Sequence, residues 1–111
     1  MEEKKEIKKL MLIAREIVPN KVYKKIKQIK DLDEKREVLR YSIKVNLELK
    51  FEELKNKIKK IEEHGKETFF ITLKMNVFKS KIKLFGATMN DNDFIKALAV
   101  FKEVEKEIKH V

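Results

Sequence analysis

Residues 41–51, Tyr-Ser-Ile-Lys-Val-Asn-Leu-Glu-Leu-Lys-Phe, decide which fold the sequence predicts. Apolar and polar residues alternate through this stretch without a break. Because successive side chains of a strand point to opposite faces, such alternation indicates a strand in a sheet with one solvent-exposed face. We therefore predict a strand over residues 41–51.

The same stretch is also compatible with a long helix. One helix starting near Asp33 would expose Val45 and Leu49 on its polar side, and we prefer the strand for that reason. Residues 52–64 are predicted to be helical in either case, with Gly65 just past the helix end. The helical alternative depends on a second apolar set, which comprises Leu39, Ile43, Leu47, Phe51, Leu54, Ile58 and Ile61.

Residues downstream return to the strand pattern. Alternation over residues 68–77, and again after Ser80, predicts two further strands. A loop over residues 86–92 then precedes a last helix with apolar residues at helical spacing. The run Asn90–Asp93 is similar to a calcium loop but lacks its central glycine and closing glutamate, so we expect it to cap this helix.

Upstream, the pattern predicts two helices and completes an α+β fold. Residues 3–18 form the first helix, which Pro19 ends, and Asn20 caps the second. Residues 1–37 are thus an N-terminal helical pair. Residues 38–111 form a core with the order strand, helix, strand, strand, helix. The simplest packing is one compact domain, a three-stranded sheet with helices on one face.

The composition excludes several kinds of function. The chain of 111 residues has no cysteine, which excludes disulfides and cysteine-based metal sites, and only two glycines, which excludes a glycine-rich phosphate loop. Its two histidines have no motif partner, so we expect no enzyme, no metal and no cofactor. The high content of lysine, glutamate and isoleucine is typical of heat-adapted, archaeal-like proteins, whereas the six asparagines argue against heat adaptation. Without a signal peptide or a membrane-spanning segment, we expect a cytoplasmic location.

The net charge of +9 favours an anionic partner, RNA before DNA or a membrane. The excess is +4 over residues 1–37, +3 over residues 38–66 and +3 over residues 67–89. The remaining residues carry −1. A lysine-rich solvated surface without an anionic partner is the alternative.

The predicted sheet would gather the candidate contact residues on its exposed face. Lysines with phenylalanines among them suit either phosphate contacts with base stacking or a contact with another protein, and we place the protein interface slightly ahead. The candidate interface residues are Phe70, Phe78, Phe85 and Tyr41. The candidate RNA-contacting residues are Lys44, Lys50, Lys74, Lys79, Lys81 and Lys83.

From about Arg40 onward, the predicted element order resembles the small dimerising subunit of the KEOPS complex, which installs threonylcarbamoyl-adenosine on tRNA. The closest local likeness is residues 81–87, followed by an aspartate that opens the last helix and by Ile95-Lys96. That family is similar to the KH fold without its Gly-x-x-Gly loop. The resemblance implies a non-catalytic subunit that pairs through its sheet as a homo- or heterodimer, within a larger complex that acts on tRNA. The alternative function is a stand-alone, basic RNA-binding domain.

Overall fold

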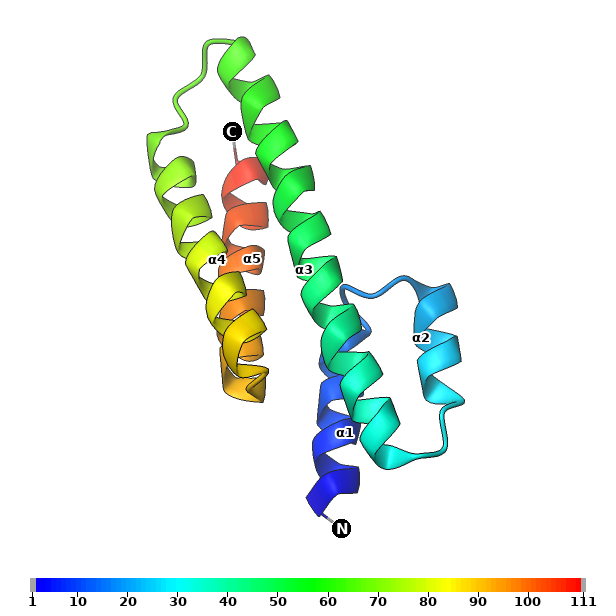
Figure 1. The fold of residues 1–111 in the computed structure, drawn as a ribbon. Coiled ribbons are helices and arrows are strands. Elements are labelled where there is room, and N and C mark those ends of the chain that lie inside the picture. The colour runs from blue at the N-terminus through cyan, green and yellow to red at the C-terminus, as the bar shows by residue number, and fades with distance from the viewer. Residues whose placement is uncertain (1, 111) are drawn as a thin grey trace. The chain divides into compact units, whose positions relative to one another are not determined.

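The computed structural model describes residues 2–110, and within that range it contains five α-helices and no strand (Figure 1). The chain divides into two compact units, Met1–Asn46 and Leu47–Val111. The boundary falls inside α3. The helices are α1 (Glu2–Ala14), α2 (Asn20–Lys27), α3 (Leu32–Glu63), α4 (Phe69–Thr88) and α5 (Asp91–Lys109).

The strand predicted over residues 41–51 is wrong, because this stretch lies within α3. The helical apolar set prevails over the alternating one. It is the longer of the two, and Leu39, Ile43 and Leu47 are fully buried. The exposure that argued against the helix is found at Leu49, which is 55% exposed, whereas Val45 is half-buried. A single exposed leucine costs little, however, and no glycine or proline interrupts residues 32–63.

The two strands predicted over residues 68–85 are wrong as well, because these residues form α4. The apolar residues that α4 buries recur every three or four positions, as helical packing requires. The α+β class, the KH-like element order and the three-stranded sheet covered by helices are therefore all replaced by an all-helical fold. The buried residues of α4 are Ile71, Met75, Phe78, Ile82 and Phe85.

The first unit contains α1, α2 and the start of α3. Its core includes Leu10, Ile26 and Leu39, which are all fully buried. Arg40 Nη2 on α3 donates a hydrogen bond to Glu6 Oε1 on α1, at 2.9 Å. Asn20 does not cap α2 as expected, because Pro19 occupies the cap position and Asn20 is already helical.

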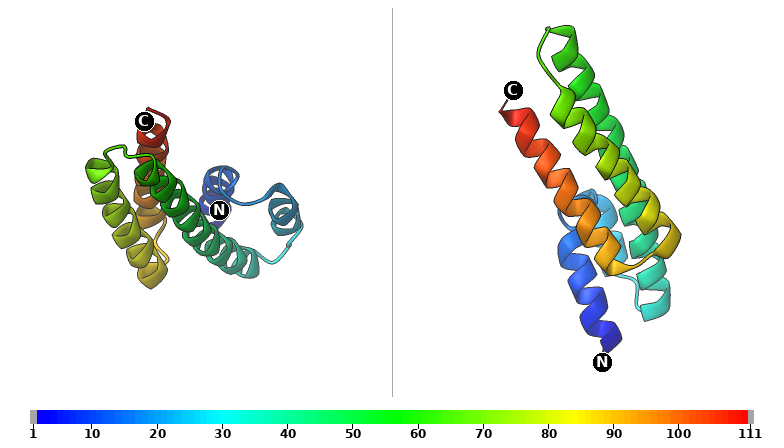
Figure 2. Two further views of the ribbon diagram at one scale, coloured as in Figure 1. Left: turned by 90° about the horizontal axis from the view of Figure 1, so that it is seen from above. Right: turned by 90° about the vertical axis from the view of Figure 1, so that its left-hand side faces the viewer.

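The second unit contains the rest of α3 together with α4 and α5. Its core is aromatic: the ring of Phe78 lies 6.1 Å from that of Phe51 on α3 and 5.8 Å from that of Phe101 on α5, between centroids. A second ring pair, Phe85 and Phe94, joins α4 to α5 near their short connection. The two helices run antiparallel and side by side (Figure 2).

Two features of the helix ends are confirmed. Gly65 follows α3 with a φ of 76°, a left-handed conformation that glycine adopts readily. Asn90 caps α5, and its side-chain oxygen accepts a hydrogen bond from the backbone N–H of Asn92 at 2.8 Å. Over the described residues, no helix combines the length and the apolar character needed to cross a membrane.

We expect Phe78→Ala to lower the free energy of unfolding by about 3–5 kcal/mol, because it removes a fully buried ring that contacts both neighbouring helices. Chemical denaturation followed by circular dichroism measures this change. The matched control is Phe70→Ala on the same helix, which should change stability by about 0.5 kcal/mol or less because Phe70 is exposed. Equal losses from both variants would contradict the orientation of α4.

Candidate functional site

Helix α4 has a second apolar side, which faces solvent. Four large apolar residues lie there, with exposed fractions between 43% and 72%. Their spacing of three, four and seven positions keeps them on one side of the helix, away from the buried set. We call this surface the α4 stripe; its residues are Phe70, Leu73, Val77 and Leu84.

All the formal charges on α4 are positive. The helix contains four lysines and neither aspartate nor glutamate. Lys74 Nζ lies 3.0 Å from Glu107 Oε1 on α5, a half-exposed ion pair. Lys79 and Lys83 are exposed and form no ion pair with any residue that the structure describes. The α4 stripe therefore lies on a helix that attracts anionic groups.

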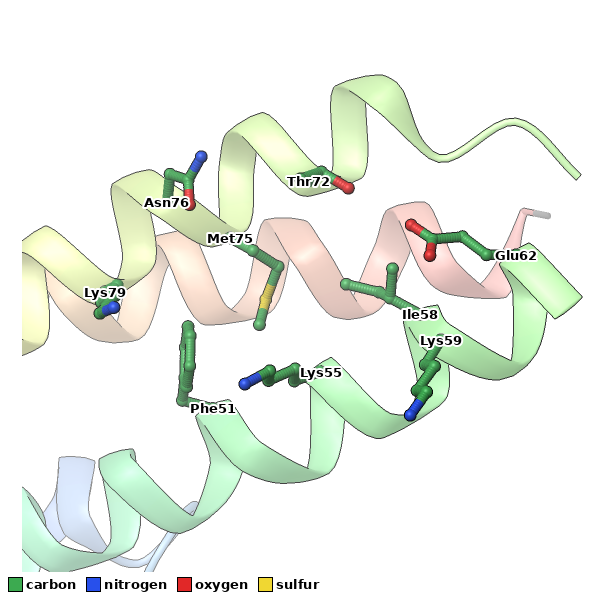
Figure 3. A pocket seen from close by; sticks show the side chains of 9 residues that line it. All are labelled: Phe51, Lys55, Ile58, Lys59, Glu62, Thr72, Met75, Asn76 and Lys79. Atoms are coloured by element: carbon green, nitrogen blue, oxygen red, sulfur yellow. The ribbon is translucent and has the colours of Figure 1, made fainter.

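A groove of about 530 Å³ separates α4 from the facing part of α3 (Figure 3). Its centre is apolar, with the buried side chains of Ile58 and Met75 and the half-buried ring of Phe51. Helix α5 passes behind this centre in the close-up view. The groove is lined by Phe51, Lys55, Ile58, Lys59 and Glu62 from α3 and by Thr72, Met75, Asn76 and Lys79 from α4.

The polar groups along the groove are mostly cationic. The lining contains three lysines, Lys55, Lys59 and Lys79, and one carboxylate, that of Glu62. Glu62 Oε1 already accepts a hydrogen bond from the hydroxyl of Thr68, at 2.7 Å. The groove can therefore offer ammonium groups beside an apolar surface, which suits an anion with an apolar body.

The structure separates the four predicted interface residues. Phe70 belongs to the exposed α4 stripe, whereas Phe78 and Phe85 are fully buried in the core of the second unit. Tyr41 is exposed on the part of α3 that belongs to the first unit. The burial of Phe78 and Phe85 follows from helical spacing, since residues seven positions apart share one side of a helix.

The six predicted RNA-contacting lysines are not brought together either. Lys44 belongs to the first unit, and Lys50 on α3 lies 3.5 Å from Glu53 Oε2. Of the four on α4, only Lys79 lines the groove. Lys81 lies two positions further along and therefore on another side of the helix.

The sequence alone does not predict most residues of the α4 stripe or of the groove between α3 and α4. The alternation over residues 68–77 predicts Leu73 and Val77 on one face of a strand, although their spacing with Phe70 and Leu84 fits one side of a helix. Lys55 and Lys59 carry no distinguishing signal, because lysines four positions apart are common on exposed helices. Within residues 2–110, no group of three histidine, aspartate or glutamate side chains lies close enough to hold a metal ion.

No family model matches this chain, and neither the curated proteins nor the solved structures contain a match to it. The resemblance to the KEOPS subunit family therefore stays untested by comparison. The sheet through which that family would pair is absent from the part of the chain that the structure describes. The surfaces of the helices are thus what supports a function.

We expect Leu73→Gln/Val77→Gln to leave the free energy of unfolding within about 1 kcal/mol of the parent, because both side chains are about half exposed. The same variant should lower the fluorescence of 8-anilinonaphthalene-1-sulfonate, a dye that binds exposed apolar surface. The matched control is Ile71→Gln, which should cost about 2–5 kcal/mol because it places an amide in the core. Unchanged dye fluorescence would show that the α4 stripe is not an accessible apolar surface.

Proposed function

We propose that this protein is a non-catalytic binding subunit whose α4 stripe docks onto an acidic amphipathic helix of a different protein. The observation that carries this proposal is the pair of apolar sides on α4, one buried in the core and one exposed. Large side chains gathered on one exposed helix side are typical of an interaction surface.

The geometry of the stripe favours a helix as the docked element. A helix that is apolar on more than one side is normally enclosed by other helices, and α4 has α3 and α5 on its buried side alone. From Phe70 to Leu84 the stripe is about 21 Å long, which is roughly four turns of a partner helix. Spacings of three, four and seven residues are those by which amphipathic helices are recognised. Ser80, a small residue between Val77 and Leu84, leaves room for close approach of a backbone.

The charges favour an acidic partner over a second copy of the chain. Two α4 helices packed through their stripes would bring together the lysines next to the stripe, Lys74 and Lys81, which follow Phe70 and Val77 by four positions. Helix α4 carries no carboxylate to compensate, and only Lys74 has an acidic neighbour on another helix, Glu107 of α5. Outside α4, the only exposed large apolar residue described in the second unit is Leu49. The first unit adds Leu12, Val22 and Tyr41, each on a different helix, so the described residues outside α4 form no row of apolar side chains comparable to the stripe. A different chain with carboxylates flanking its apolar residues would both compensate the lysines and cover the apolar side chains of the stripe.

The proposal keeps the role of accessory subunit and moves it to a new surface. Pairing through a sheet is not part of it, and the link to tRNA and the cytoplasmic location stay predictions. Direct RNA binding has less support than protein binding, because the lysines predicted for it are distributed over both units and several sides of the helices.

Site-specific photocrosslinking in the native cell tests the proposal. A benzoylphenylalanine at position 73 lies in the α4 stripe, and the same residue at position 49 is the control on α3. We expect position 73 to yield a protein adduct, mapped by mass spectrometry to a segment with apolar residues at helical spacing and flanking glutamates or aspartates. The same photocrosslinker at position 49 should not yield this adduct.

A pair of matched substitutions then measures the energetic contribution of the stripe. Leu73→Asp should weaken binding of the identified partner at least about tenfold, because it places a carboxylate in an apolar contact and opposite acidic residues. Leu49→Asp makes the same chemical change on α3 and should leave the affinity within about twofold. Adducts at position 73 with a second copy of the chain, with RNA or with lipid would each contradict the proposal, as would the lack of any adduct.

A further inference from the structure

The groove between α3 and α4 lies on a third side of α4. Thr72, Asn76 and Lys79 line it from α4, and none of them belongs to the α4 stripe. These three residues are four and three positions apart, so they share one side of the helix. Docking of a partner helix on the stripe leaves this groove without an assigned role.

Among the residues that the structure describes, the lysines of the groove have no carboxylate partner. Lys55, Lys59 and Lys79 form no ion pair with the described residues. Glu62 is the one acidic residue of the lining, and its carboxylate is hydrogen-bonded to Thr68. With three lysines and one glutamate, the lining of the groove carries two more positive than negative charges.

The two ends of the groove differ in charge. Figure 3 shows Lys79 at one end, the ring of Phe51 and then Lys55 next to it, and Glu62 toward the other end. The ammonium group of Lys59 points away from α4. The ring of Phe51 and the thioether of Met75 lie next to the end that carries Lys55 and Lys79. An anionic group and a flat apolar group can thus be held side by side.

We propose that this groove binds a nucleotide, with the phosphate at Lys55 and Lys79 and the base against Phe51 and Met75. Lysine binds phosphate as a point charge, and an aromatic ring and a methionine sulfur both pack well against a planar base. Thr72 and Asn76 supply a hydroxyl and an amide that can hydrogen-bond to the polar edge of the ligand. A volume of about 530 Å³ lies in the range of small-ligand sites.

The same chemistry is presented by a free mononucleotide and by one nucleotide of an RNA strand. Adenosine monophosphate and a short single-stranded oligoadenylate are therefore the two probes, and adenosine without phosphate is the third. Isothermal titration calorimetry with the full chain measures the affinity for each. Adenosine monophosphate should bind at least about tenfold more tightly than adenosine, because only the phosphate engages the lysines.

Two double variants with the same loss of charge locate the site. Lys55→Gln/Lys79→Gln removes the two lysines at one end of the groove. Lys57→Gln/Lys81→Gln removes lysines two positions further along the same helices, which lie on the opposite sides of those helices. The first variant should weaken nucleotide binding about tenfold or more, and the second by about twofold or less.

The outcomes separate the two sources of the ligand. The groove variant should weaken every phosphate-bearing probe that the parent binds. If the parent binds adenosine monophosphate at least as tightly as the oligoadenylate, the ligand is a free nucleotide. If it binds the oligoadenylate more tightly, the ligand is a nucleotide within RNA. Equal losses from both double variants, or no binding of either phosphate-bearing probe, overturn the proposal. Leu73→Asp should leave nucleotide binding unchanged, so failure of the groove and failure of the α4 stripe are distinguishable.

Discussion

The ring of Phe78 is the contact on which the second unit depends. It is fully buried, and it lies against Phe51 of α3 and Phe101 of α5, so each helix of this unit contributes one ring. Fixing Phe78 inward also fixes the rotation of α4 about its own axis. Helical geometry then determines which residues face the core, the groove and solvent. The positions of the α4 stripe and of the groove therefore both follow from the packing of Phe78 between α3 and α5.

The charges on α4 bear on whether two copies of the chain would pair through the stripe. Four large side chains on an exposed helix side would normally promote association between copies. Here the helix carries four lysines and no acidic residue, and Lys74 and Lys81 lie beside the stripe, so we expect two copies that approach through it to repel each other. The same charge pattern does not oppose an acidic partner. Specificity of this kind comes from repulsion of the wrong partner as much as from attraction of the right one.

The sequence predicts the structure correctly where a stretch carries one hydrophobic period, and it fails where a period of two and a helical period overlap. Gly65 after α3, Asn90 at the start of α5 and the buried side of the last helix follow from local rules, and these predictions are confirmed. Residues 41–51 carry a period of two and a helical period together. Only the second continues beyond the stretch, from Leu39 to Ile58, and this continuation outweighs the exposure of Leu49.

The binding surfaces were harder to predict because α4 is apolar on two sides. When apolar residues fall both on the core side and on the stripe, nearly every short window contains an alternating pattern, and a strand is the natural interpretation. Under that interpretation Phe70 and Phe78 share a face, whereas in the helix one is exposed and the other is in the core. The groove could not be predicted at all. It depends on the space between two helices, and its lysines look like any others on a solvated surface.

The division of α4 into three sides also bears on how its two surfaces relate. The core set, the groove set and the stripe are separated by roughly a third of a turn each, as a repeat of 3.6 residues per turn requires. A helix docked on the stripe therefore does not cover Thr72, Asn76 or Lys79. Coupling between the two sites would need α4 to rotate or shift, and Phe78 resists that movement because both neighbouring helices hold its ring. The packing thus favours a partner and a nucleotide that bind at the same time and independently of each other.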